Sequence, residues 1–245
     1  MTDRSAMSGR VVSSSPPEPA RGAATAGPWF ILGMALVCGG VASIFNRAIG
    51  GTLLATGVLT AAVLFLARDR VRTLSRWTTG AAAAGAAMLC IGPFAAGAAM
   101  ATTRLDGWTL LALGAALAAA SSFVWARSVK QHNTNWEALR SVNEGEVLDL
   151  RAATFDVGRS FVYDPKPHPG GASGPPTRAV SAAAFAATLA AGFGRGSNAD
   201  LRELVVMAVA PVVLLGLMPM VAMGVVTWRK IREYERTLGR EIHNR

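Results

Sequence analysis

The chain has 245 residues, of which 51% are apolar and only 16% charged, whereas a soluble domain carries about 25% charged residues. Its formal net charge of +9 would point to nucleic acid in a soluble protein. The charges are clumped, however, and leave five uncharged stretches long enough to cross a bilayer as helices. The composition therefore predicts a multi-pass membrane protein whose basic residues fix its orientation and meet anionic lipids. It counts against a nucleic-acid partner.

The N-terminal part, residues 1–27, is rich in Ser, Pro, Ala and Gly and is predicted to be a disordered tail. Two apolar runs follow, at about 29–45 and 49–67, and only the short sequence "NRAIGG" lies around their junction. Helices joined by so few residues are expected to form a tight antiparallel hairpin.

A basic stretch, "RDRVRTLSR", precedes a second pair of apolar runs at about 79–101 and 108–125. Residues 28–126 are therefore predicted to form a four-helix transmembrane region built from two hairpins. Pro93 falls inside the third run, where a proline frees a backbone carbonyl and is expected to kink the helix.

A polar segment, residues 127–177, comes next and is predicted to lie in the cytoplasm. Its first part has helical spacing and is expected to prolong the fourth helix towards Gly145. Partial alternation around 155–163 predicts one or two short strands or an irregular loop, and a Pro- and Gly-rich connector follows. The segment is too small to bury a core alone, so it must rest on the membrane domain, another copy or a partner.

The C-terminal part is predicted to be a transmembrane hairpin over residues 178–228, followed by a basic amphipathic tail over 229–245. Pro211 and Pro219 lie within its strong apolar run and argue against a straight helix. In the tail, an apolar stripe at helical spacing predicts a helix that lies on the inner leaflet, packs on a partner, or simply extends the last span. The stripe consists of Ile231, Tyr234, Leu238 and Ile242.

Residues 179–194 are the ambiguous span, because about 24 Å of alanine-rich helix is short for a hydrocarbon core of about 30 Å. If they cross, Lys and Arg number 20 on one side and 4 on the other; if they lie at the interface, the numbers are 16 and 8. The positive-inside rule favours crossing. The predicted fold is an all-α polytopic bundle of about six transmembrane helices, or five if this segment is interfacial. Both termini are placed in the cytoplasm, at a bacterial inner membrane.

The interiors of the strong spans contain no ionisable residue, which counts against an ion-coupled transporter. A passive pore lined by groups such as Ser121 and Ser122 stays open. No nucleotide-binding or hydrolase motif is present, and no cofactor or metal is expected. Five carboxylates in the polar segment are spaced widely for a hard-cation site and are typical of a solvated face. These are Glu144, Glu146, Asp149, Asp156 and Asp164.

Small residues spaced four apart predict close helix packing within the bundle or with other subunits. Cys38 and Cys90 lie inside apolar runs and are expected to be small packing residues. The candidate helix-packing residues are Ala35, Gly39, Ser43, Gly51, Ala55, Gly85, Gly92 and Gly97. The candidate lipid- or partner-contact residues are Arg229, Lys230, Arg232 and Arg236.

The favoured hypothesis is a non-catalytic membrane subunit or scaffold of a multi-protein assembly, of the secretion or envelope type, with membrane lipids and other subunits or further copies as partners. The alternatives are a small passive channel or transporter, and a membrane enzyme with its site in residues 127–177.

Overall fold

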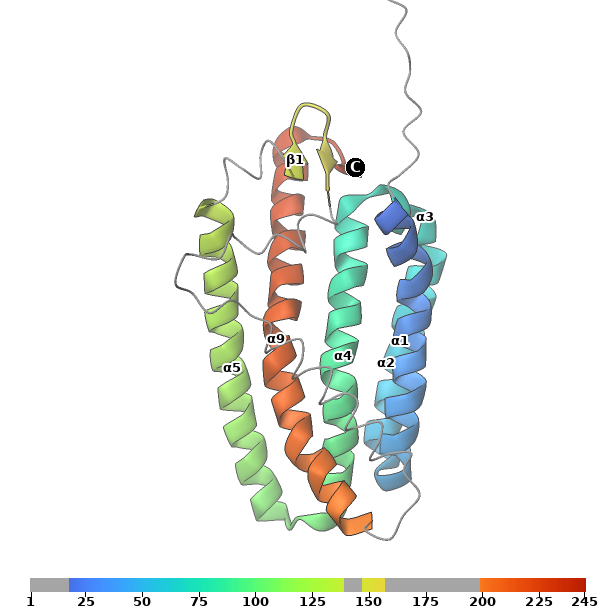
Figure 1. Ribbon diagram of the computed structural model, residues 1–245, viewed down its shortest axis with the longest axis vertical. Helices are drawn as coiled ribbons and strands as arrows, with labels where there is room; N and C mark the ends of the chain where they lie inside the picture. Colours follow the sequence, from blue (N-terminus) through green and yellow to red (C-terminus); the bar gives the residue numbers. More distant parts are fainter. Residues whose placement is uncertain (1–17, 139–146, 157–198) are drawn as a thin grey trace, which may run out of the picture.

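The computed structural model describes residues 18–138, 147–156 and 199–245, and long helices dominate them (Figure 1). Five of these helices are long and apolar enough to cross a membrane, which confirms the predicted helical class and all five strong apolar runs. The helices are α1 (Glu18–Phe45), α2 (Arg47–Leu66), α3 (Arg68–Thr73), α4 (Ser75–Arg104), α5 (Gly107–Ala138) and α9 (Ala199–Leu238).

The first hairpin is as tight as predicted, because Asn46 alone separates α1 from α2. The Asn46 side-chain oxygen accepts hydrogen bonds from the amides of Ala48 and Ile49, at 3.1 and 3.2 Å. These bonds satisfy two of the amides that a helix start leaves without partners. Asp106 does the same for α5, where its carboxylate accepts from the amides of Trp108 and Thr109.

The helices differ from the sequence expectation at the start of α1, in the basic stretch after α2 and at the prolines of α4 and α9. Residues 18–27, expected in a tail, lie at the start of α1. The basic stretch after α2 forms the short helix α3. Prolines do not interrupt the long helices: α4 continues through Pro93, and α9 continues through Pro211 and Pro219. The first half of α9 is inclined to its second half (Figure 1), as prolines in a helix allow.

The tail does not remain helical as far as Ile242. α9 ends at Leu238, and Gly239 follows with a positive φ of 64°, a backbone conformation that favours glycine after a helix. The chain then turns back to form β3 (His243–Asn244), which pairs in parallel with β2 (Thr154–Phe155). β2 pairs in an antiparallel way with β1 (Leu148–Asp149), so short strands do form near the predicted place.

The directions of the last three long helices constrain the path of the chain. α4 and α9 are antiparallel, since Gly97 lies against Ala210 while Gly80 lies against Trp228. α5 and α9 are parallel, because Leu117 of α5 packs near Val213 of α9 and Glu137 binds Lys230 further along. Figure 1 shows both helices rising from the same end of the bundle. Asp156, beside the small sheet, and Ala199, at the start of α9, therefore lie at opposite ends of the bundle.

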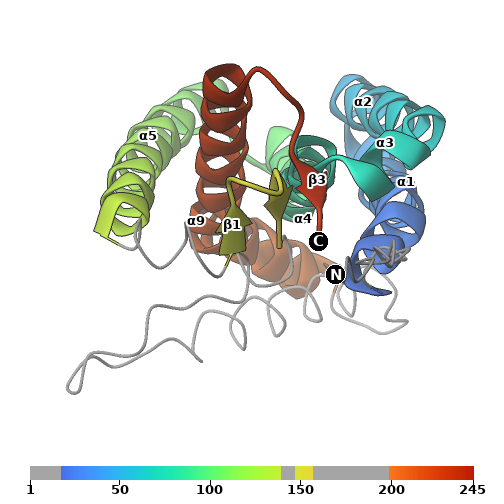
Figure 2. The ribbon, with the colours of Figure 1, turned by 90° about the horizontal axis from the view of Figure 1, so that it is seen from above.

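Buried side chains form three clusters along the described chain. The first joins α1, α2, α3 and α4 around Ile31, Met34 and Leu53. The second joins α4 and α9 around Cys90, Val213 and Leu217. The third lies at one end of the bundle, where α9, the small sheet and Ile242 meet. α4 is thus the central helix, and α5 stands at the edge of the bundle beside α9 (Figure 2).

Candidate functional site

Close backbone approach between α1 and α2 depends on glycines. A Cβ added at Gly57 would overlap Ala35, and one at Gly50 would overlap Ser43. A Cβ at Gly39 would lie 2.7 Å from the Cγ of Leu54, closer than real Cβ atoms approach. Since lipid offers no hydrophobic drive between helices, packing this close is what would hold such a pair together in a membrane.

Small residues also allow α4 to pack closely against neighbouring helices on two of its sides. Towards α1, Gly92 leaves room for Cys38, whose Sγ would lie 3.1 Å from an added Cβ. Towards α9, an added Cβ at Gly97 would lie 2.5 Å from the Cβ of Ala210, and one at Gly224 would lie 2.9 Å from that of Ala83. Cys90 is also buried, and its thiol donates to the carbonyl of Leu214 at 3.2 Å.

The predicted packing residues divide into two groups. Ala35, Gly39, Gly92 and Gly97 are buried between helices of this chain, and Ser43 and Gly85 are half-buried there. Gly51 and Ala55 are exposed on the outer face of α2, so their contact with another subunit stays a prediction.

Sequence reasoning missed Gly50, Gly57 and Gly224 as contact residues. A usable signal was present in α2, where the buried residues recur at intervals of three or four. They are Gly50, Leu53, Gly57, Ala61 and Leu64.

α5 is the least covered of the long helices. None of the residues in its most apolar stretch is buried within the described chain. Leu117, Ala120, Ser121 and Val124 are only half-buried and follow one line along the helix, the line that turns towards α9. Small residues lie exposed on another line, at Gly114, Ala118 and Ser122.

One end of the bundle is closed by a structure that we call the cap, made of residues 71–78, 147–156 and 231–245. Its core contains Val147, Leu148, Phe155, Ile231 and Ile242, each no more than 2% exposed. The ring of Trp136 stacks on that of Phe155 with centroids 6.4 Å apart, which joins α5 to the sheet.

The last residues of the chain bind the corner between α3 and α4. The amide of Ser75 donates to the carbonyl of Ile242 at 3.0 Å. The Asn244 side-chain amide donates to the carbonyl of Arg72 at 2.9 Å and to the hydroxyl of Thr78 at 2.7 Å. Arg76 forms ion pairs with Glu241 at 2.7 Å and with Glu235 at 3.5 Å. The cap therefore ties together segments that are far apart in the sequence.

The predicted basic contact residues lie in the cap or directly before it in α9, and they differ in exposure. Arg229 and Arg236 are exposed. Lys230 is half-buried and forms ion pairs with Glu137 at 2.7 Å and Glu233 at 3.5 Å. Arg232 is exposed and stacks over the ring of Trp228, with its Cζ 5.1 Å from the ring centroid.

Of the five carboxylates considered for cation binding, only Asp149 and Asp156 lie in the described part of the chain. Asp149 accepts bonds from the amides of Arg151 and Ala152, and the Ala152 amide bond holds the pKa of Asp149 below its usual value. Among the described residues, no group of three or more His, Cys, Asp or Glu side chains is placed to hold a metal ion. Glu144, Glu146 and Asp164 lie outside the described residues.

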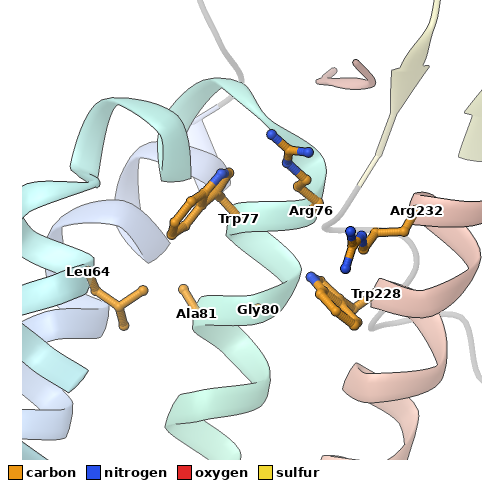
Figure 3. Close-up of a pocket in the computed structure, with 7 residues that line it drawn as sticks. All are labelled: Leu64, Arg76, Trp77, Gly80, Ala81, Trp228 and Arg232. Carbon is orange, nitrogen blue, oxygen red and sulfur yellow. The ribbon is translucent and has the colours of Figure 1, made fainter. Parts of the chain in front are cut away.

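A pocket of about 350 Å³ opens next to the cap, between α2, α4 and α9 (Figure 3). Trp77 of α4 and Trp228 of α9 lie on either side of it, and Gly80 separates them at its floor. Arg76 and Arg232, which both belong to the cap, line one end of the pocket. The other lining residues, Leu64 and Ala81, are apolar and lie deeper in the bundle.

The chain matches no known protein family, no curated protein and no solved structure.

Proposed function

We propose that this protein is a non-catalytic integral membrane subunit, which spans the bacterial inner membrane six times and joins an assembly of the secretion or envelope type. The observation that carries the proposal is the exposure of α5, a long apolar helix with none of its most apolar stretch buried within the described chain. The exposed line at Gly114, Ala118 and Ser122 is the kind of surface that transmembrane helices use to approach one another.

The parallel direction of α5 and α9 supports the sixth crossing. If both helices span the membrane, Asp156 and Ala199 lie on opposite sides of it, and a further span would connect them. The predicted crossing over residues 179–194, which lies outside the described residues, falls in this interval. With it, both termini lie on the cap side, which is cytoplasmic by the positive-inside rule.

A sixth helix of this chain would not by itself cover α5. A helix buries a stripe roughly 100° wide against one neighbour, and α9 already takes one such stripe. A second stripe of the same width for the sixth helix still leaves about 160° of the circumference, somewhat under half, free. We assign that free part, with its small residues, to another subunit or a further copy.

Photo-crosslinking in native membranes tests this assignment. A photoreactive side chain at Ser122 on α5 is expected to give a discrete protein adduct of higher mass. The same probe at Leu59, 67% exposed on α2, is the matched control and is expected to label lipid. Reaction with the chain's own sixth helix adds no mass, so it is distinguished from capture of a partner.

A substitution at the surface sharpens the test. Gly114→Leu adds bulk where an added Cβ meets nothing within 4 Å in this chain, so the chain should fold while the Ser122 adduct weakens at least several-fold. Gly33→Leu, at an equally open position on α1, should leave the adduct unchanged. Lipid labelling alone at Ser122 would refute the subunit proposal.

A further inference from the structure

The pocket between α2, α4 and α9 has the polarity of a lipid molecule. Leu64 and Ala81 are buried and line its deeper part, while Arg76 and Arg232 line the part next to the cap (Figure 3). Trp77 and Trp228 also line the pocket, with Trp228 beside Gly80 and below Arg232 in the view of Figure 3. Tryptophan is enriched at the membrane–water interface of membrane proteins, because its ring is apolar and its N–H is polar.

Two arginines close to the pocket have no carboxylate partner in the part of the chain that the structure describes. Arg76 is occupied, because Glu235 and Glu241 both pair with it. Arg232 stacks over Trp228, and Arg70 lies over Trp77 with its Cζ 5.9 Å from the ring centroid. Within the described ranges, neither Arg70 nor Arg232 forms an ion pair with Asp or Glu. Each tryptophan thus carries an arginine whose charge is available to an anion.

We infer that this pocket binds one anionic phospholipid, with its phosphate at Arg232 and an acyl chain running over Gly80 towards Leu64. The inference depends on the membrane placement in the proposed function, but not on the subunit role. The volume of about 350 Å³ lies in the range of ligand pockets, about 300–1,000 Å³. Guanidinium groups suit phosphate oxygens because their N–H donors match them in geometry.

The apolar part excludes a free inorganic anion as the preferred occupant. Burying the walls formed by Leu64, Ala81 and the two tryptophan rings is favourable only for a ligand that brings apolar surface. Charge complementarity at Arg232 disfavours a zwitterionic lipid, whose own cation would offset the gain. A membrane phospholipid with a net negative head group meets both conditions.

Native mass spectrometry of the full-length chain, purified in mild detergent and stripped of lipid, tests this inference. The probes are phosphatidylglycerol and phosphatidylcholine with identical acyl chains. We expect the first phosphatidylglycerol to bind more tightly than the first phosphatidylcholine. Arg232→Gln should weaken that step about fivefold, the factor equivalent to the ~1 kcal/mol typical of one basic residue near anionic lipid. Arg229→Gln, which removes a neighbouring exposed charge outside the pocket, should leave it unchanged.

Filling the pocket is an independent test. An added Cβ at Gly80 meets only the Cδ1 of Trp228, at 3.9 Å, so Gly80→Leu occupies the cavity without a backbone clash. It should abolish the high-affinity step while keeping the unfolding temperature. Gly216→Leu, at an open position of α9, is the size control and should bind like the wild type.

Three results would overturn the lipid site: equal affinity for the two lipids, equal losses in Arg232→Gln and Arg229→Gln, or wild-type binding by Gly80→Leu. The measurement uses the purified chain without any partner. A tight phosphatidylglycerol step in a chain that gives no protein adduct at Ser122 would support the lipid site while refuting the subunit proposal. A protein adduct at Ser122 in a chain without a tight phosphatidylglycerol step would support the subunit proposal while refuting the lipid site.

Discussion

Ile242 is the residue on which docking of the C-terminal tail depends most. It is 0% exposed and contacts the core of the cap. Its backbone is also engaged, with its amide donating to Glu235 at 3.2 Å and its carbonyl accepting from Ser75. Truncating a buried isoleucine to alanine costs about 2–5 kcal/mol. The Ile242→Ala variant should therefore release the tail far more often than the wild type.

The size of the effect follows from the same figures. A loss of about 3 kcal/mol raises the population of the undocked tail roughly 100-fold. The helical bundle should stay intact, because the other two buried clusters contain no residue of the tail.

Hydrogen exchange measures this release directly. The amide of His243 donates to the carbonyl of Ala153 at 2.9 Å, so its protection should fall roughly 100-fold in Ile242→Ala. Amides within α1 and α4 should keep their protection. The neighbouring substitution His243→Ala removes an exposed side chain and serves as the control. Unchanged exchange at position 243 in Ile242→Ala would refute a cap held by this side chain.

Two further predictions concern the helices. Gly97→Leu should lower the unfolding temperature, because a Cβ at position 97 would lie 2.5 Å from the Cβ of Ala210, and overpacking of this kind costs about 1–3 kcal/mol or more. Gly114→Leu, at an open position, should leave the unfolding temperature unchanged. At the start of α5, bonds from Thr109 hold the pKa of Asp106 below its usual value. The stabilisation is therefore complete above the ordinary carboxyl pKa and is lost as the pH falls through the lowered one. In circular dichroism, the wild type should lose some helix signal as Asp106 is protonated at acid pH, and Asp106→Asn should not show this part of the loss. The same pH dependence of the helix signal in the variant and the wild type would contradict this role of Asp106.

The long helices were predictable from the sequence because their signal is local. Charge-free apolar runs indicate spans by length alone. It was harder to predict which face of each helix packs against its neighbour, because small residues at a spacing of four occur on several faces of the same helix. In α2 the pair Gly51 and Ala55 fits the pattern, yet Gly50 and Gly57 make the close approach to α1.

The cap was not predictable, because it depends on contacts between distant segments. The spacing of Leu238 and Ile242 fits a continuous helix as well as it fits a helix followed by a turn. Gly239 was the local signal for the turn. Nothing local indicates that Asn244 reaches the corner at Arg72. The pocket depends on the antiparallel packing of α4 and α9, which brings Trp77 and Trp228 to the same pocket. Only tertiary packing sets this arrangement.

The direction of the chain through the membrane is the most direct test of the central claim, since the subunit surface and the lipid pocket both depend on it. Compartment-specific reporters fused after residue 198 and after Arg245 report on opposite ends of α9. The six-span arrangement places the first reporter in the periplasm and the second in the cytoplasm. A cytoplasmic signal at 198 with a periplasmic signal after Arg245 would contradict it.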